Sequence, residues 1–498
     1  MKKVYRFSEL IAGTDCRLQG DADPEITGIC YDSRKAEGGS VFVALTGHSA
    51  DGHKYARSAY DRGCRCFILE KDAGLPEDAS VAYTDNTRIT LGLVSMNFFG
   101  HPERRIKLIG ITGTKGKTST ALMIRGIFTA AGISCGYIGS NGAMFAGRHF
   151  DTDNTTPESY EIIRLLSMMS EDGVTHAVLE VSSQALFNYR VSGLRFEACG
   201  FTNLSRDHIS PAEHPTFEHY RDSKKRLFTD EYGASYVAYN ADDPSSPYIV
   251  GESSSELMGY GIENGDYLRA EDIVKISDSK GLGVKFRAVW CSGDSKEIRL
   301  LTPGTFSVSN ALCAMTVAGA FGIGPDTAAA GLENYDHSGR CEMVDTPVRD
   351  VRFIIDYAHN GVSLRSALSE IRQYSPKRLV CVFGSIGDRT FERRRELAEA
   401  AGSLADFSVI TSDNPGYEDP DGIISEVESF LPEGAEHVCI TDRAEAVRYA
   451  VMNSRPGDVV LFAGKGHEKY QYVQGSKVPF SERELIIKYA DIKDIKEK

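Results

Sequence analysis

The sequence predicts an α/β protein of more than one domain, organised around a doubly wound, mostly parallel sheet. Three observations favour this fold class. The chain has 498 residues, too many for one ordinary hydrophobic core, and this length is typical of about three domains. A central block alternates apolar strands with helix-like segments. A glycine-rich turn at 110–118 joins one of those strands to one of those helices.

Composition restricts the class of partner. The hydrophobic share is 41%, the charged share is 25% and the net charge is −14. This charge argues against a nucleic-acid partner, which needs a basic footprint, but local cations can still hold a small anion. The apolar run at the amino terminus is too short for a signal peptide, and no segment approaches the roughly 20 apolar residues of a membrane span. The 11 cysteines are scattered, which is typical of reduced thiols. We therefore expect a cytoplasmic protein without a membrane partner.

The elements follow in order along the chain. Residues 1–100 mix short strands and helices, including a buried strand at 41–45, and a polar, proline-containing stretch at 101–105 predicts a boundary. The central block contains strand patterns at 175–182, 199–205 and 283–290 and a helical pattern at 309–322. A second boundary is predicted near 338–340.

The last block has apolar strands at 378–384, 407–413 and 458–464, each followed by a glycine or polar loop. Ligands of open α/β sheets lie outside the carboxyl ends of the strands, so these loops can face one.

The turn Gly110-Ile111-Thr112-Gly113-Thr114-Lys115-Gly116-Lys117-Thr118 predicts a phosphate cradle. Backbone N–H groups and the helix dipole favour an anion, Lys117 adds a point charge, and the Thr118 hydroxyl is placed to hold Mg²⁺. Strict P-loop spacing requires glycine at 111, where Ile111 stands, and Gly110 and Gly113 lie close enough to replace it. The alternative is an ordinary strand-to-helix turn.

Polar residues also follow the next two strands. Glu180 ends an apolar run, where a carboxylate suits Mg²⁺, although a surface glutamate is the alternative. Asn203 lies at the polar end of the pattern at 199–205, and Asp207 and His208 follow it. An Asx-type turn is the alternative for Asn203 and Asp207, and a loop histidine is the alternative to a metal role for His208. By charge pattern alone, Lys224 belongs to an exposed basic helix face.

Together these residues resemble the Mur ligases, the ATP-dependent amino-acid ligases of peptidoglycan synthesis, and in particular the UDP-N-acetylmuramoyl-tripeptide synthetases. The likeness spans nearly the whole chain. Its motifs occur in order: YDSRKAEGGSVFVALTGHSADGHKY, GITGTKGKTST, NTTPE, LEVSSQAL, FTNLSRDH, GRCE, DYAHN, FGSIGDR, SDNPGYEDP and AGKGHE. The unusual glycine spacing of the cradle is also the family's own.

The resemblance implies three domains: a small α/β UDP-substrate-binding domain at 1–100, a central ATP-binding P-loop domain at 101–338 and a Rossmann-like amino-acid-binding domain at 339–498. It implies that the carboxylate of UDP-MurNAc-L-Ala-D-Glu attacks the γ-phosphate of ATP. The acyl phosphate is then attacked by the amine of a free amino acid, in a step that supports cell-wall formation, cell shape and division. The family is commonly monomeric.

The resemblance also implies site residues. ATP contacts are Gly113, Thr114, Lys115, Gly116, Lys117, Thr118, Ser119, Asn310, Arg340, Asp356 and His359. UDP-substrate contacts are Ser33, His48, Ser49, Ala50, Asn154, Thr155, Thr156, Ser182, Asn188 and Arg190. The alternatives from the residues themselves are a polar loop for Ser33 and a surface ion pair for Arg190. Tyr357 and Ala358 are expected to be packing residues.

Two Mg²⁺ sites are implied. Thr118 and Glu180 resemble the ligands of one, and His208 and Lys224 those of the other. Lys224 would be carbamylated by CO₂, which turns a cation into a carboxylate-like ligand. Lys117, Lys224 and His208 are the implied catalytic residues.

The amino-acid pocket implied by the family comprises Arg389, Asp413, Asn414, Gly464 and Glu468. Diaminopimelate enzymes carry arginine after Asp-Asn-Pro, where this chain has Gly416. The clamp for the distal carboxylate is then lost, and Asp413 and Glu468 could receive a distal ammonium. We therefore expect a lysine-like substrate ahead of meso-diaminopimelate, although Lys465 could replace the clamp.

Further departures indicate a divergent branch: Gln184, Ser307, Asn360-Gly361 and Arg395 stand where the family usually has other residues. The sequence argues against two rival functions, a folylpolyglutamate synthase and a non-catalytic paralogue. A folylpolyglutamate synthase lacks the amino-terminal UDP segment, and a non-catalytic paralogue would not need Lys117, Glu180 and Lys224.

Overall fold

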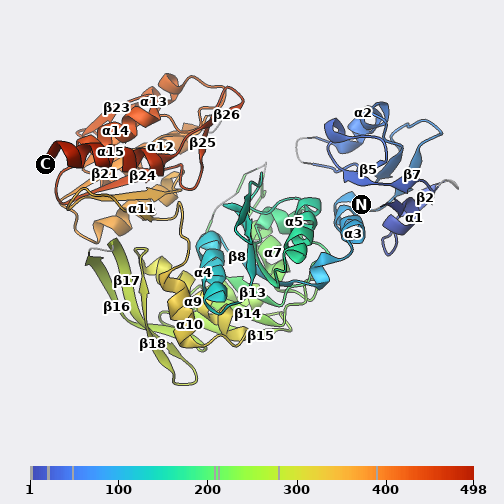
Figure 1. Ribbon diagram of the computed structural model, residues 1–498, viewed down its shortest axis with the longest axis horizontal. Coiled ribbons are helices and arrows are strands. Elements are labelled where there is room, and N and C mark those ends of the chain that lie inside the picture. The colour runs from blue at the N-terminus through green and yellow to red at the C-terminus, as the bar shows by residue number, and fades with distance from the viewer. Residues whose placement is uncertain are drawn as a thin grey trace. The chain divides into compact units, whose positions relative to one another are not determined.

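The structure is a computed structural model that describes residues 4–19, 23–47, 50–206, 209–210, 213–278, 281–387 and 391–497. The chain forms two compact units, coloured by residue number in Figure 1. Unit 1 comprises Met1–Ala270, Ala288–Lys296 and Ser309–Tyr335. Unit 2 comprises Glu271–Arg287, Glu297–Val308 and Asp336–Lys498.

The amino-terminal sheet of unit 1 has the strand order β2-β7-β6-β5-β4, in which β4 to β7 are parallel and β2 is antiparallel. Its strands are β2 (Arg17–Gln19), β4 (Gly28–Cys30), β5 (Ser40–Val43), β6 (Cys66–Leu69) and β7 (Ser80–Tyr83). A separate antiparallel ribbon pairs β1 (Tyr5–Arg6) with β3 (Glu25–Ile26). The helices are α1 (Phe7–Leu10), α2 (Ala56–Asp61) and α3 (Thr87–Phe99), with short 3-10 turns η1 (Ser33–Lys35) and η2 (Gly52–Tyr55).

The central sheet begins with the order β11-β10-β9-β12-β8-β13-β14-β15-β16. Strands β9 (Cys135–Gly139), β12 (His176–Glu180), β8 (Lys107–Thr112), β13 (Ala198–Phe201), β14 (Tyr236–Asn240), β15 (Glu256–Gly261) and β16 (Leu268–Asp278) are parallel. The antiparallel strands β10 (Gly142–Phe145) and β11 (Arg148–Phe150) form one edge. The order continues into β17 (Gly281–Trp290) and β18 (Ser295–Leu300).

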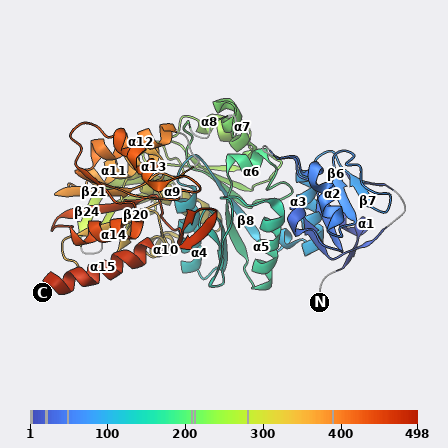
Figure 2. The ribbon, with the colours of Figure 1, turned by 90° about the horizontal axis from the view of Figure 1, so that it is seen from above.

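Helix α4 (Lys117–Ala130) packs on β8, β9 and β12, as its place beside β8 in Figures 1 and 2 shows. Other helices of this region are α5 (Ser159–Glu171), α6 (Ser183–Phe187), α7 (Phe217–Lys225), α8 (Ser246–Val250), α9 (Thr305–Ala320) and α10 (Pro325–Glu333), with 3-10 turns η3 (Pro102–Arg104) and η4 (Arg226–Phe228). Because β8 is a buried apolar strand that ends at a glycine turn, the chain reverses there into α4 and places the turn at the carboxyl edge of the sheet.

Unit 2 contains a second sheet with the order β19-β20-β24-β21-β22-β23. Its strands are β19 (Glu342–Val344), β20 (Arg352–Asp356), β24 (Asp458–Ala463), β21 (Arg378–Phe383), β22 (Phe407–Ile410) and β23 (His437–Cys439), and all but β19 are parallel. A separate hairpin pairs β25 (Tyr470–Val473) with β26 (Ser476–Pro479).

Alternate residues of β24 enter different cores. Val459 and Leu461 pack with α11 (Gly361–Arg372), α12 (Phe391–Leu404) and α13 (Pro420–Ser429), whereas Val460 and Phe462 pack with α14 (Arg443–Met452) and α15 (Glu482–Glu497). The side-chain period of two in a strand buried on both faces produces this division. The doubly wound α/β class predicted from the sequence is confirmed.

The predicted strands are all present, but most are shorter than their apolar patterns. The patterns at 175–182 and 199–205 correspond to β12 and β13, which end at Glu180 and Phe201, because the polar residues that follow leave the sheet. Within the described ranges, no helix combines the length and the apolar character needed to cross a lipid bilayer.

Candidate active site

The cradle lies between two polar strand ends. In the parallel order β12-β8-β13, Glu180 pairs in register with Ile111, and Phe201 with Thr112. The carboxyl ends of the three strands therefore meet at one edge. This edge carries the glycine turn, Glu180 and the segment that begins at Thr202.

Glu180 is fully buried, so a surface glutamate is excluded. One carboxylate oxygen, Oε2, accepts from the Thr118 hydroxyl at 3.0 Å, and the other accepts from the Tyr137 hydroxyl at 2.5 Å and the Ser140 amide at 3.0 Å. The cradle hydroxyl and a buried carboxylate thus form a pair of hard oxygen donors. This donor set fits Mg²⁺.

Asn203 braces the cradle. Its side-chain oxygen accepts from the Lys115 amide, its side-chain nitrogen donates to the Lys115 carbonyl, both at 3.0 Å, and its carbonyl accepts from the Thr114 amide at 2.8 Å. Its role is therefore to shape the turn rather than to form an Asx turn. The predicted ATP contact Asn310 also reaches the turn, because a Cβ at Gly116 would lie 2.2 Å from the Asn310 side-chain oxygen. Ser119 follows in α4.

Lys224 is 1% exposed, so the exposed basic face expected from the charge pattern is wrong at this residue. Helix α7 directs Lys224 inward because Tyr220, one turn earlier, is also buried and donates to the Thr114 hydroxyl at 2.9 Å. The ammonium groups of Lys224 and Lys117 both donate to the carbonyl of Gly113, at 2.8 and 2.9 Å. Two cations thus converge on the cradle. His208 and Asp207 lie outside the described residues.

A cavity of about 140 Å³ joins the cradle to the predicted UDP-substrate residues. Two of its lining residues, Ser183 and Gln184, were assigned no contact role from the sequence, although both lie in the motif LEVSSQAL and Gln184 departs from the family pattern. The Ser183 hydroxyl is hydrogen-bonded to Nε2 of the fully buried His214 at 2.9 Å. The predicted residues that line the cavity are Lys117, Asn154, Thr155, Thr156, Ser182, Arg190 and Lys224.

Arg190 forms an ion pair, in which its Nε donates to Glu158 at 3.0 Å, but both side chains are mostly buried, so this is not the surface pair that was the alternative. It also donates to the Thr156 carbonyl at 3.0 Å, and so supports the wall of the cavity. The hydroxyl of Thr156 in turn donates to the backbone of Glu180 at 2.8 Å. Asn188 directly follows α6.

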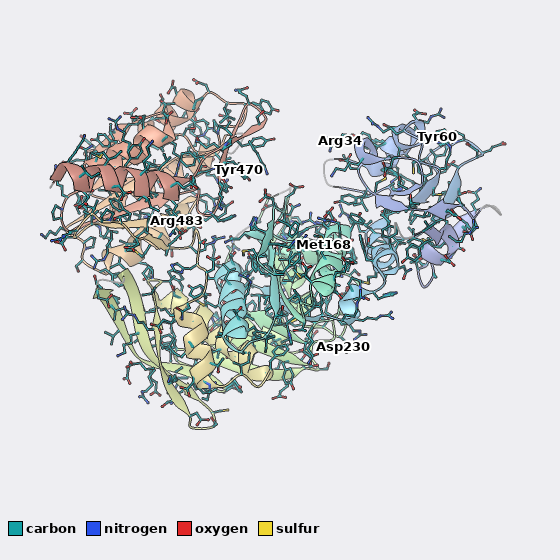
Figure 3. The ribbon with its side chains drawn as sticks, viewed as in Figure 1. Arg34, Tyr60, Met168, Asp230, Tyr470 and Arg483 are labelled. Atoms are coloured by element: carbon teal, nitrogen blue, oxygen red, sulfur yellow. The ribbon has the colours of Figure 1, made fainter. Side chains whose placement is uncertain are left out.

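Two of the predicted UDP-substrate contacts, Ser33 and Ala50, lie in the described connections between strands of the amino-terminal sheet. Ser33 opens η1, three residues after β4, and its neighbour Arg34, labelled in Figure 3, is bound by Asp32 at 2.8 Å. The Ala50 carbonyl accepts from the Gly47 amide at 2.8 Å. His48 and Ser49 lie outside the described residues.

In unit 2, three predicted nucleotide residues surround the end of β20. Burial raises the pKa of Asp356, against the lowering effect of Arg340. Burial lowers the pKa of His359, whose Nδ1 donates to the Tyr357 carbonyl at 2.8 Å. Arg340 stacks over the Tyr357 ring at 4.9 Å.

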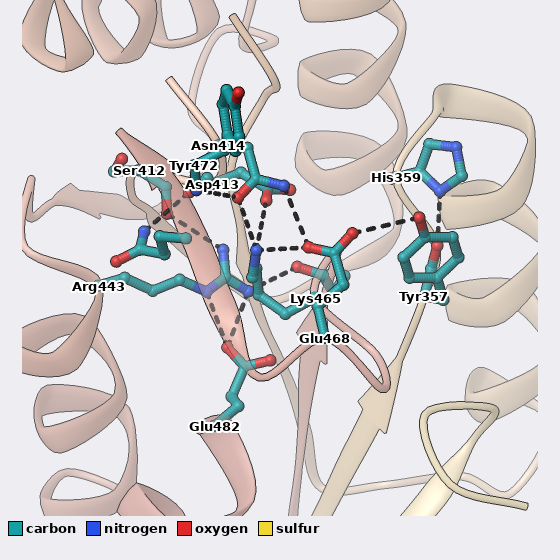
Figure 4. A network of polar contacts seen from close by, with 12 residues as sticks. Tyr357, His359, Ser412, Asp413, Asn414, Arg443, Lys465, Glu468, Tyr472 and Glu482 are labelled. Atoms are coloured by element: carbon teal, nitrogen blue, oxygen red, sulfur yellow. Dashed lines mark hydrogen bonds and ion pairs between the residues drawn. The ribbon is translucent and has the colours of Figure 1, made fainter. Parts of the chain in front are cut away.

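Three residues predicted to bind the amino-acid substrate, Asp413, Asn414 and Glu468, lie around Lys465 in the network of Figure 4. This fully buried ammonium donates to Glu468 at 2.6 Å and to Asn414 at 2.8 Å, and lies 3.6 Å from Asp413. Burial alone would raise the pKa of Glu468, but Lys465 outweighs it and the pKa lies below its usual value. The Tyr357 hydroxyl, expected to be packing, donates to Glu468 at 3.3 Å.

Two consequences follow for this pocket. Lys465 is paired with acidic side chains and is therefore not available to bind the distal carboxylate of a substrate. The acidic pair Asp413 and Glu468, which we expected to receive a substrate ammonium, already contacts the ammonium of Lys465. Both oxygens of Asp413 are buried and lack a hydrogen bond to any residue that the structure describes. A Cβ at Gly464 would lie 2.6 Å from Asp413, so only glycine fits there. Arg389 lies outside the described residues.

Gly416 has a left-handed backbone, with φ of +64°. Its amide donates to the Tyr472 carbonyl at 3.0 Å, and its carbonyl accepts from the Gln474 amide at 2.7 Å. The loop is thereby fixed to the β25–β26 hairpin in a conformation that favours glycine.

Comparison with known proteins agrees with this arrangement. Family profiles match for the Mur ligase family catalytic domain at residues 25–91, the Mur ligase middle domain at 111–318 and the Mur ligase glutamate ligase domain at 339–466. Two curated relatives are both named UDP-N-acetylmuramoyl-L-alanyl-D-glutamate--2,6-diaminopimelate ligase. The protein of Caldanaerobacter subterraneus is 37% identical over 97% of this chain and 98% of its own. That of Bacillus licheniformis is 38% identical over 94% and 95%.

A solved structure with the same ligase name superposes with a TM-score of 0.67 at 25% identity, covering 99% of both chains. A Mycobacterium tuberculosis folylpolyglutamate synthase shares the fold at 17% identity with a TM-score of 0.60, over 76% of this chain. The likeness to the diaminopimelate ligases thus covers a larger share of the chain. The cradle, its buried carboxylate and the full-length relatives lead to one conclusion: this chain belongs to the Mur ligase family of ATP-dependent, ADP-forming ligases.

Proposed function

We propose that this enzyme adds meso-diaminopimelate, as the third residue of the peptide, to UDP-MurNAc-L-Ala-D-Glu. One observation supports the reaction above others: the cavity in which the cradle residue Lys117 meets the predicted substrate residues Thr155, Ser182 and Arg190. A carboxylate held there lies next to the place where ATP would present its γ-phosphate. The reaction depends on this proximity and on neutralised anionic charge.

The choice of diaminopimelate replaces the lysine-like substrate expected from Gly416. Curated relatives over the full length are named for diaminopimelate. The acidic pair Asp413 and Glu468, on which the lysine expectation rested, is already engaged by Lys465. A substrate that carries its own distal carboxylate as well as an ammonium suits a pocket of mixed charge.

Different residues of the chain have different proposed roles in the reaction. Lys117 neutralises phosphate oxygens, while Thr118 and Glu180 would hold Mg²⁺, which supplies charge neutralisation when bound. Lys224 is proposed to carry a CO₂-derived carbamate for a second Mg²⁺ together with His208. As an ammonium, Lys224 donates to the Gly113 carbonyl and would repel a metal ion, so this role requires the modification. An active preparation whose intact mass shows only unmodified lysine would remove it.

The remaining assignments are proposals of the same kind. Domain boundaries are placed at 100/101 and 338/339, with ATP contacts contributed by the second and third domains. The dependence on ATP and on a UDP-linked precursor suits a cytoplasmic enzyme, and the proposal that it is a monomer rests on the family resemblance alone.

ADP release tests the function directly. Purified enzyme is given Mg²⁺, ATP and UDP-MurNAc-L-Ala-D-Glu, with diaminopimelate, L-lysine or L-ornithine in turn, and the product is weighed by mass spectrometry. We expect release that requires both precursor and amino acid and is fastest with diaminopimelate. Preference for lysine would restore the original expectation. Nucleotide binding without any product would instead indicate a non-catalytic paralogue.

A further inference from the structure

A group of metal-ligating side chains lies in unit 2, on the edge strand of its sheet. His437 and Cys439 are two apart on β23, so both point to the same face of the strand. Glu428 comes from the last turn of α13. The ligand atoms of the three residues all lie within 4.8 Å of one another. None of them belongs to the network around Lys465.

The hydrogen bonds of His437 fix its orientation. Nδ1 donates to the Ala435 carbonyl at 2.8 Å, which leaves Nε2 directed at Glu428 Oε1 at 3.1 Å. A backbone carbonyl that holds the second ring nitrogen is a common support of histidine metal ligands. Two acceptors at this distance would repel, so without a cation Nε2 must carry a proton, in accord with the pKa of His437, which Ala435 and Glu428 raise. A metal ion would take the place of that proton.

The donor set points to a borderline or soft cation. Thiolate, imidazole and carboxylate are ligands of Zn²⁺, whereas Mg²⁺ prefers oxygen alone. Tetrahedral zinc with bonds of about 2.0–2.3 Å separates its ligand atoms by about 3.5 Å, so rotations of exposed side chains suffice to close the site. One carboxylate and one thiolate balance the charge of a divalent ion.

We propose that Glu428, His437 and Cys439 form a zinc site, with water as the fourth ligand. The ion ties the end of α13 to β23 across the connecting segment 430–436. Binding displaces one proton from the His437 imidazolium and one from the Cys439 thiol.

The test uses the full-length protein and alkylation of cysteine by iodoacetamide, followed by peptide mapping. Cys439 and Cys291 are both exposed, so Cys291 is an internal control. We expect Zn²⁺ to slow alkylation of Cys439 at least tenfold, to leave Cys291 unchanged, and to raise the melting temperature. Mg²⁺ at the same concentration should have neither effect. Equal protection of both cysteines, or protection by Mg²⁺, would overturn the site.

Cobalt provides a second readout that does not depend on reactivity. Co²⁺ bound to a thiolate gives a near-ultraviolet charge-transfer band, which Zn²⁺ should abolish. The band should persist in Cys291→Ser and disappear in Cys439→Ser, and His437→Ala should weaken Co²⁺ binding at least tenfold. Retention of the band in Cys439→Ser would refute the assignment. Ligase activity of Cys439→Ser should equal that of the native enzyme, so the zinc site and the proposed function can fail separately.

Discussion

Replacing Gly416 by arginine tests two properties of the loop at residues 413–416: its backbone conformation and its lack of a positive charge. The residue has φ of +64°, and both its amide and its carbonyl are hydrogen-bonded to the β25–β26 hairpin. Because those bonds prevent the loop from relaxing, a side chain there costs about 1–2 kcal/mol. For a unit of roughly 150–250 residues this corresponds to a melting temperature about 2–8 °C lower.

The guanidinium should also change specificity. A charge-assisted pair with the distal carboxylate contributes about 1.5–3 kcal/mol, which is roughly a 10- to 150-fold increase in the ratio of kcat/KM for diaminopimelate over lysine. Gly416→Ala is the matched control, since it bears the backbone cost without the charge. Coupled ADP release with each amino acid gives the ratio, and thermal melts give the backbone cost.

Two results would refute this reasoning. If Gly416→Arg and Gly416→Ala give the same ratio of kcat/KM, the side chain at 416 does not face the distal carboxylate. If Gly416→Ala melts at the temperature of the native protein, the left-handed backbone is not held by the hairpin.

Other predictions concern charge and burial. Glu482→Gln should lower the free energy of unfolding in urea by about 3–5 kcal/mol, because Glu482 pairs at 2.8 Å with the fully buried Arg443; exchange of both residues for apolar ones should recover most of the loss. Glu180→Gln should reduce Mg²⁺-dependent ADP release about 10²-fold or more and raise the Mg²⁺ concentration needed for half-maximal rate, and an unchanged Mg²⁺ titration would exclude Glu180 as a ligand. The lowered pKa of His359 means that the unfolded chain binds a proton below about pH 6.5 while the folded chain does not, so stability should fall as pH drops from there. In thermal melts, the fall in melting temperature between about pH 8 and about pH 5.5 should be smaller for His359→Phe than for the native protein.

Much of the fold could be predicted because its signals are local. The alternation of apolar strands with helical patterns identifies an α/β sheet, and the glycine turn after β8 marks its carboxyl edge. Glu180 could be found in the same way, since it ends a strand, and strand ends of a parallel sheet share one edge.

The amino-acid sequence alone predicts the family, through motifs that occur in order. It also predicts the cradle and the polar residues at the strand ends, because backbone geometry and strand polarity fix these within a short segment. Which side chains meet could be established only from the folded chain. The inward direction of Lys224, the engagement of Lys465 by the acidic pair and the approach of Glu428 to His437 and Cys439 depend on how distant elements pack. Helical charge patterns and loop motifs do not predict such contacts. A charged side chain can be stabilised by water or by a buried partner, and the partner comes from a distant part of the chain.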